Sequence, residues 1–191
     1  MTGAKEIQTL PPLEELRRST PLSQRTGEPP RPATVVISAV AAYLAVAGVA
    51  GVYALHWWQA AHPETYAASA RLIGWVAPPP GKWLSLTLEG AIAAAALVAA
   101  GAVGVAGFQA WNGWRWSRWA ALAGLLLTGG FAAVTSDWAY LAAGLALVVA
   151  VLVWLPPTAT YFRRWDEVRA ARPGGYRRPE RIYYGRLPRF R

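Results

Sequence analysis

Four long runs of apolar residues occupy the middle of this chain, at residues 33–55, 88–110, 119–135 and 138–155. They contain 23, 23, 17 and 18 residues, and as helices rising about 1.5 Å per residue they would be roughly 25–35 Å long. The hydrocarbon core of a bilayer is about 30 Å thick. Backbone groups in lipid must be paired within the structure, and the runs lack the alternation of a barrel strand, so each run predicts a membrane-spanning helix.

The pattern as a whole predicts an all-α, polytopic integral membrane protein with four transmembrane helices. Turn-forming residues at 112–113 separate the second run from the third, and residues 135–137 separate the third from the fourth. Such short connections predict two antiparallel hairpins. The chain then divides into a proline-rich N-terminal arm (1–32), a transmembrane domain (33–157) with an exterior loop (56–87), and an Arg/Tyr-rich tail (158–191).

Composition agrees with a membrane domain and excludes sites that depend on cysteine. Hydrophobic residues make up 54% of the chain and charged residues only 15%, against about 25% charged residues in a typical soluble domain. The chain has no cysteine, which excludes a disulfide framework, a thiolate metal site and a cysteine-ligated cluster.

The basic residues predict the orientation in the membrane. The net charge is +9, and 17 of the 19 Lys and Arg residues lie before the first run, between the second and third runs, or after the fourth. The exterior loop carries only Arg71 and Lys82. The positive-inside rule therefore places both termini in the cytoplasm and the protein in the inner (plasma) membrane as a multi-pass protein.

Tryptophans gather at the predicted helix ends, where an indole ring prefers the headgroup region. We interpret them as an anchoring belt, with an aromatic ligand cage as the alternative. The belt consists of Trp57, Trp58, Trp83, Trp111, Trp114, Trp116, Trp119, Trp138 and Trp154.

The two polar segments before and after the first run differ in character. The N-terminal arm holds six prolines and no sustained apolar period, which predicts a largely disordered arm with a short helix at residues 13–18. Ser19 and Thr20 follow two arginines there, so phosphorylation is an alternative to an unmodified arm. In the exterior loop, a short helix is expected from Pro63 toward Trp75, with an apolar side at positions 66, 70 and 73 and with Trp75 as a further candidate for that side.

Few side chains are suited to chemistry. His56 and His62 diverge at helical spacing and have no further ligands beside them, so we interpret His56 as interfacial and His62 as a helix cap. Glu89 is expected in the first turn of the second helix, stabilised by the helix dipole, with proton entry or substrate binding as the alternative. Asp137 is expected to cap the fourth helix. We therefore predict no catalytic residue, no cofactor site and no metal site.

Glycines within the runs remove side-chain bulk and allow helices to approach closely, which is the main source of helix association in lipid. They are therefore expected on packing surfaces, within the bundle or toward other subunits. These residues are Gly48, Gly51, Gly101, Gly104, Gly107, Gly129, Gly130 and Gly144.

The tail combines basic and aromatic residues. Residues 161–171 can form a cytoplasmic helix, and proline and glycine prevent a long helix beyond it. Such a tail can bind anionic headgroups, an acidic protein surface or nucleic acid, and its position beside the membrane favours anionic lipids or other membrane-protein subunits, with no nucleic acid expected. The expected lipid or partner contacts are Arg163, Arg164, Arg177, Arg178, Arg181, Arg186 and Arg189.

Two classes of function remain. The first is a non-catalytic accessory or structural subunit of a larger membrane complex, and the absence of a polar pathway through the runs favours it. The second is a small self-contained transporter, channel or lipid-handling protein.

The layout resembles that of a known family. Four Ala- and Gly-rich helices follow a proline-rich start, and the chain ends with the segments RRWDEVR (163–169) and YYGRLPRFR (183–191). This resembles small accessory subunits of the actinobacterial respiratory supercomplex, in which a cytochrome bcc complex joins a haem-copper cytochrome oxidase. The resemblance implies a respiratory role in which haem and copper belong to neighbouring subunits, while this chain stabilises the assembly.

Overall fold

A computed structural model describes residue 23 and residues 28–171, and all regular structure within them is helical. The helices are α2 (Ala33–Ala60), the 3-10 helix η1 (Tyr66–Ala68), α3 (Arg71–Val76), α4 (Trp83–Trp111), α5 (Ser117–Val134), α6 (Ala139–Leu152) and α7 (Pro156–Ala171). The predicted helix at 13–18, Ser19 and Thr20, and the arginines from Arg177 onward lie outside the described residues.

Three of these helices, α2, α4 and α5, are long and apolar enough to cross a membrane. A fourth span is counted if α6 and α7, which meet at a bend of 63°, form one bent span. The all-helical membrane prediction is thus confirmed for the described residues, with three to four candidate spans. The expected fourth run ends early because Pro156 and Pro157 lack the N–H groups that would continue α6.

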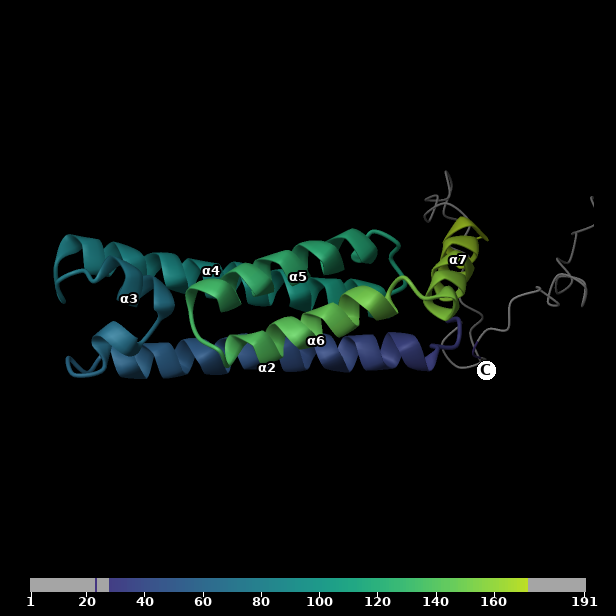
Figure 1. Cartoon of the computed structure of the whole chain (residues 1–191). Helices are drawn as coiled ribbons and strands as arrows, with labels where there is room; N and C mark the ends of the chain where they lie inside the picture. The colour runs from purple at the N-terminus through teal and green to yellow at the C-terminus, as the bar shows by residue number, and fades with distance from the viewer. Residues whose placement is uncertain (1–22, 24–27, 172–191) are drawn as a thin grey trace, which may run out of the picture.

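The long helices form an elongated bundle (Figure 1). Helices α4 and α6 each pack against both α2 and α5. One end of the bundle, here called the α7 end, holds the start of α2, the turn at 112–116 and α7; the opposite loop end holds residues 61–82 and the turn at 135–138 (Figure 1). The first and last described helices therefore meet at the same end, where the Thr34 and Thr158 hydroxyls lie 2.8 Å apart.

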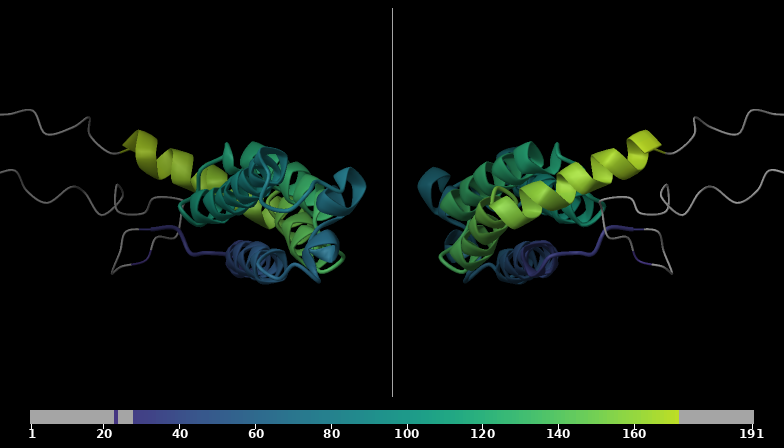
Figure 2. Two further views of the ribbon diagram at one scale, coloured as in Figure 1. Left: turned by 90° about the vertical axis from the view of Figure 1, so that its left-hand side faces the viewer. Right: turned by 90° about the vertical axis from the view of Figure 1, so that its right-hand side faces the viewer.

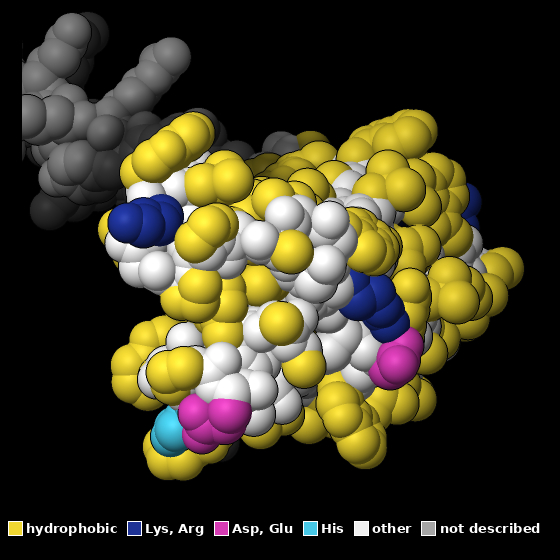
Figure 3. Space-filling model, turned by 60° about the vertical axis from the view of Figure 1, so that its left-hand side comes forward, with side chains coloured by type: hydrophobic (Ala, Val, Ile, Leu, Met, Phe, Trp, Pro, Cys, Tyr) yellow, Lys and Arg dark blue, Asp and Glu magenta, His cyan; other side chains and the backbone are white. Residues whose placement is uncertain are grey.

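Small side chains fill the centre of the bundle. Because alanine and glycine add little bulk, the helix backbones can approach closely. The fully buried residues of this centre include Ala42, Ala45, Val103, Ala106, Ala110, Ala146 and Val149. Larger apolar side chains point outward instead: Leu97 and Leu126 are both 75% exposed, which suits a surface in contact with lipid or protein. Figure 3 shows few charged side chains on such a surface.

The glycine prediction is right at three of its eight positions. A Cβ at Gly48, Gly104 or Gly107 would lie within 3.2 Å of a side chain on a neighbouring helix. The prediction missed Gly124, where a Cβ would lie 3.1 Å from the Val103 backbone. The other five have open space within 4 Å, so packing toward another subunit stays a prediction for Gly51, Gly101, Gly129, Gly130 and Gly144.

Gly107 provides a direct test of close packing between α2 and α4. A Cβ there would lie 2.4 Å from the Cβ of Ala42, so Gly107→Ala forces the two helices apart. We expect the free energy of unfolding to fall by about 1–2 kcal/mol, measured by denaturant titration in micelles. Gly101→Ala is the matched control on the same helix, because its Cβ meets no atom within 4 Å. Equal stability of the two variants would contradict this packing.

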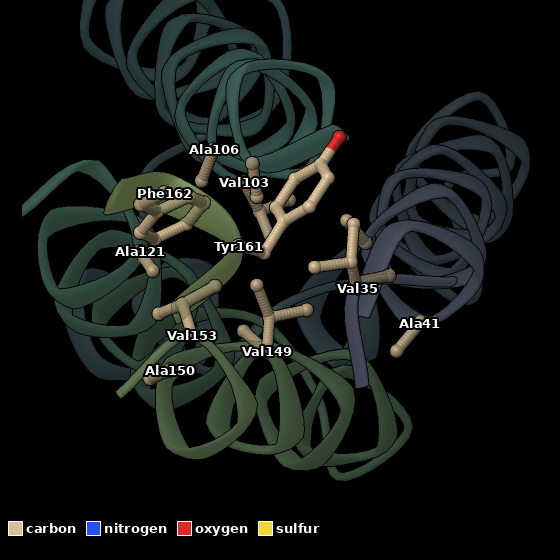
Figure 4. Close-up of a cluster of buried hydrophobic side chains, with 14 of the residues drawn as sticks. Val35, Ala41, Val103, Ala106, Ala121, Val149, Ala150, Val153, Tyr161 and Phe162 are labelled. Carbon is tan, nitrogen blue, oxygen red and sulfur yellow. The ribbon is translucent and has the colours of Figure 1, made fainter. Parts of the chain in front are cut away.

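Helix α7 closes the α7 end of the bundle (Figures 1 and 2). Tyr161, Phe162, Trp165 and Val168 are all at most 9% exposed and belong to the core cluster. Figure 4 shows Tyr161 and Phe162 among valines of the long helices. The expectation of a helix at 161–171 within a separate tail is corrected in two respects: the helix begins at Pro156, and its apolar face is part of the core.

The exterior loop contains two short helices and is bonded to the bundle. The single expected helix is broken at Ala70, which is extended and separates η1 from α3. Positions 66, 70 and 73 are at most 7% exposed, which confirms the predicted apolar side at these positions, whereas Trp75 is 67% exposed and does not belong to it. Arg71 donates to the Ala132 carbonyl at 2.8 Å and pairs with Asp137. The prediction that Asp137 caps a helix is wrong, since α6 has no side-chain cap and Asp137 joins the loop to the turn after α5.

Candidate functional site

A buried histidine and a glutamate meet near the loop end of the bundle. His56 Nε2 on α2 lies 2.7 Å from Glu89 Oε2 on α4, and the side chains are 1% and 28% exposed. His56 is thus buried between the helices, and the prediction that Glu89 lies in the first turn of its helix is wrong. It failed because α4 begins at Trp83, which places Glu89 in the second turn rather than the first, beside the packed face of α2.

The second ring nitrogen determines where the protons lie. His56 Nδ1 is 3.1 Å from the carbonyl oxygen of Ser69, between η1 and α3. A carbonyl oxygen only accepts, so Nδ1 must carry a hydrogen and donate it. The contact between Nε2 and Glu89 then contains one further proton, held either by an imidazolium or by a carboxylic acid. In both forms the pair is neutral overall, and it links α2, α4 and the exterior loop.

A pocket of about 430 Å³ opens beside this pair, and we call it the Glu89 pocket. Its walls include Tyr53, Trp57, Tyr66, Ser85 and Glu89. Two buried atoms of these walls, Glu89 Oε1 and the Tyr66 hydroxyl, make no hydrogen bond within the described residues. Burial raises the pKa of the Tyr66 phenol, the nearby Ser85 hydroxyl partly opposes this rise, and the Glu89 charge adds to it. Tyr66 therefore remains a hydrogen-bond donor at neutral pH.

The Glu89 pocket has no polar continuation into the bundle among the described residues. Within the bundle, Thr128 donates to the Gly124 carbonyl of its own helix at 2.7 Å, and neither Thr128 nor the buried Ser38 lines the pocket. Within residues 28–171, no three His, Cys, Asp or Glu side chains gather as metal ligands. The arrangement can bind a small polar group, and it lacks the chain of groups that would move a proton across the membrane.

His62 lies apart from the pair. Its Nδ1 is 2.7 Å from the Trp58 carbonyl, in the last turn of α2, and its ring contacts the Trp58 ring. This contact confirms the predicted capping role, because it satisfies a carbonyl at the end of the helix.

The α7 end holds a second, basic pocket. Of the seven predicted contact arginines, only Arg163 and Arg164 are described, and both lie on α7. Arg163 lines a pocket of about 390 Å³ together with Arg115 and Arg118, whereas Arg164 does not line it. In the sequence, Arg115 and Arg118 indicate only the orientation of the chain in the membrane. Their shared pocket depends on how α5, α6 and α7 meet.

Comparisons of this chain with protein-family models, curated proteins and solved structures found no match. What the protein does is therefore inferred from its own residues and geometry.

Proposed function

We propose that the protein crosses the plasma membrane four times, with the α7 end, and so both termini, in the cytoplasm. The fourth crossing is α6 together with the bend that leads into α7. The distribution of basic residues supports this orientation. The loop end carries Arg71 and Lys82 alongside Glu64, Glu89 and Asp137, while the α7 end carries Arg31, Arg115, Arg118, Arg163, Arg164 and Arg169 alongside Glu28, Asp166 and Glu167.

Within that membrane, the protein acts as a non-catalytic accessory subunit that stabilises a larger complex. The observation that carries this proposal is the interior of the bundle, where small apolar side chains separate the Glu89 pocket from the basic pocket. A channel or carrier needs polar groups along its path. The outward-facing leucines and tryptophans, and the five glycines with open space beside them, offer packing surfaces for neighbouring helices.

Native electrophoresis tests the subunit proposal. After extraction in a gentle detergent, the protein is expected to migrate with an assembly several times its own mass of 20.6 kDa. Crosslinking from the α7 end, read by mass spectrometry, would then identify the neighbouring subunits. Migration as a lone monomer or homo-oligomer, with no crosslinked neighbour, would contradict an accessory role.

A respiratory complex is the proposed partner, on the strength of the resemblance in layout to accessory subunits of the actinobacterial supercomplex. Deletion of the gene is expected to lower the amount or size of that complex and to slow oxygen consumption. An unchanged complex and unchanged oxygen consumption would remove the respiratory part of the proposal while leaving the subunit role open to the native gel.

The second candidate function is a small self-contained transporter, channel or lipid-handling protein. The Glu89 pocket favours it, because two buried polar atoms beside an open pocket can hold part of a ligand. Reconstitution into liposomes separates the two candidates. Movement of a solute or lipid by the purified protein alone would support this second function and exclude a purely structural one.

A further inference from the structure

Three arginines from three segments face one pocket at the α7 end, here called the arginine pocket. Arg115 belongs to the turn before α5, Arg118 to the first turn of α5, and Arg163 to α7. The remaining wall is formed by Trp154, Pro156, Ala159 and Thr160. Three like charges repel one another unless an anion or solvent screens them, so their convergence points to a negatively charged ligand.

Arg118 is the fixed member of the three. Its Nε donates to the Val153 carbonyl at 3.2 Å, and its guanidinium lies 5.3 Å from the ring centres of both Trp154 and Phe162. These contacts hold the guanidinium plane in place. The two Nη groups make no hydrogen bond within the part of the chain that the structure describes, so their N–H donors are free for a ligand. A planar fork of this kind binds two oxygens of a phosphate at once.

The charge balance at the arginine pocket is positive. No acidic residue lines it. The nearest pairing is Asp166, whose carboxylate lies 3.7 Å from Arg115 and 3.5 Å from Arg169, at a half-exposed position. Arg163 donates to the Thr160 hydroxyl at 3.2 Å, and Glu167 stands one turn further along α7 without lining the pocket. The helices α5 and α7 also begin at this pocket, and the positive ends of their dipoles favour an anion there.

An exposed apolar track leads away from the arginine pocket along the bundle. Trp154 packs edge-to-face on Trp119 with ring centres 5.7 Å apart, at the depth expected for headgroups. Leu126 stands two turns along α5 from Trp119, and Val151 and Leu147 stand one and two turns along α6 from Trp154. All three are at least half exposed. A ligand with a charged head and hydrocarbon chains would therefore contact favourable surface along its whole length.

We propose that the arginine pocket binds the phosphate of an anionic phospholipid, with Arg118 as the bidentate anchor, Arg163 and Arg115 completing the charge, and the acyl chains lying along α5 and α6. The volume of about 390 Å³ lies in the range of specific ligand sites and suits a phosphoglycerol headgroup. This site goes beyond the accessory role and does not depend on it, since a lipid bound here would also serve a protein that acts alone.

Native mass spectrometry of the full chain in mild detergent tests the site. Phosphatidylglycerol and the zwitterionic phosphatidylcholine are titrated separately, and retained lipid is counted at each concentration. For the unaltered protein, we expect the apparent Kd for phosphatidylglycerol to be about tenfold lower than for phosphatidylcholine. Arg118→Gln is expected to remove most of that preference, and Arg163→Gln, at an exposed position, to weaken phosphatidylglycerol binding about threefold.

Arg164→Gln is the matched control, because it removes the same charge from the same helix outside the pocket. Its effect should stay below about twofold. If Arg163→Gln and Arg118→Gln leave lipid retention unchanged, or if Arg164→Gln weakens it equally, the site is overturned. Displacement of phosphatidylglycerol by millimolar inorganic phosphate would assign the pocket to a soluble anion and overturn its assignment to lipid.

Discussion

Replacing His56 by alanine is expected to lower the free energy of unfolding by about 3 kcal/mol. The substitution leaves the Glu89 carboxylate without its only described partner, at a position that is 28% exposed, and it leaves the Ser69 carbonyl without its donor. Removing one member of a buried charged or hydrogen-bonded pair costs more than the pair itself contributes, because the other member stays desolvated. Denaturant unfolding in mixed micelles, followed by circular dichroism, measures the loss.

Two further variants distinguish the loss of the interaction between His56 and Glu89 from the loss of a large side chain. Adding Glu89→Gln to His56→Ala removes the stranded charge, so the double variant should lose less stability than the two single variants summed, by about 1 kcal/mol or more. His62→Ala is the matched histidine control, since its ring contacts Trp58 at the end of α2, and it should cost no more than about 1 kcal/mol. Additive effects of His56→Ala and Glu89→Gln would show that the two groups do not interact.

The contact between His56 and Glu89 could not be predicted from the apolar runs alone. His56 directly follows the run that ends at residue 55, and Glu89 is the second residue of the run that begins at residue 88. A helix in a membrane protein continues beyond its apolar run into the interfacial region, and here α2 ends at Ala60 and α4 begins at Trp83. The similar depth of the two residues in the membrane could have predicted their contact, because the end of one span and the start of the next lie at the same membrane surface.

The parts of the fold that were predicted correctly depend on properties of single segments. Length and hydropathy identify the apolar helices, and the tryptophans predicted at helix ends are exposed there except for the partly buried Trp111, with Trp83 at 76% and Trp138 at 68%. The parts that were not predicted depend on pairs of segments. The docking of α7 needs the turn after α4, and the arginine pocket needs three segments at once. Without homologous sequences, a single chain carries no direct record of such pairings.

The two ends of the bundle have different chemistry, and this difference suits a protein held at both membrane surfaces. At the loop end, the pair of His56 and Glu89 links α2, α4 and the exterior loop. Arg71 joins the same loop to the end of α5. At the α7 end, cations face outward around a pocket, while Arg169 donates to the carbonyls of Asn112 and Gly113 at 2.6 and 2.9 Å. The short turn after α4 thus accepts hydrogen bonds that help to hold α7 against the bundle.

That turn gives the second large expected effect, from Gly113→Ala. Gly113 has φ = +71°, and a Cβ there would lie 1.9 Å from Cδ1 of Trp165, a ring that is buried in the core cluster. The left-handed backbone costs alanine about 1 kcal/mol, and the overlap with a buried ring costs a further 1–3 kcal/mol or so. Because the ring is packed among core side chains, the overlap is expected to displace α7 from the bundle end. Hydrogen exchange of the amides at 156–171 should then accelerate at least about tenfold.

Gly81→Ala separates the two causes. Gly81 has φ = +73°, but a Cβ there meets no atom within 4 Å, so this variant carries the backbone cost alone and should leave exchange in α7 unchanged. Adding Trp165→Ala to Gly113→Ala removes the overlap and should restore part of the stability that Gly113→Ala loses. Since α7 carries Arg163 and Thr160, Gly113→Ala should also weaken phosphatidylglycerol retention at the arginine pocket. Slow exchange in α7 of the Gly113→Ala protein, equal to that of Gly81→Ala, would mean that the turn does not hold α7 in place.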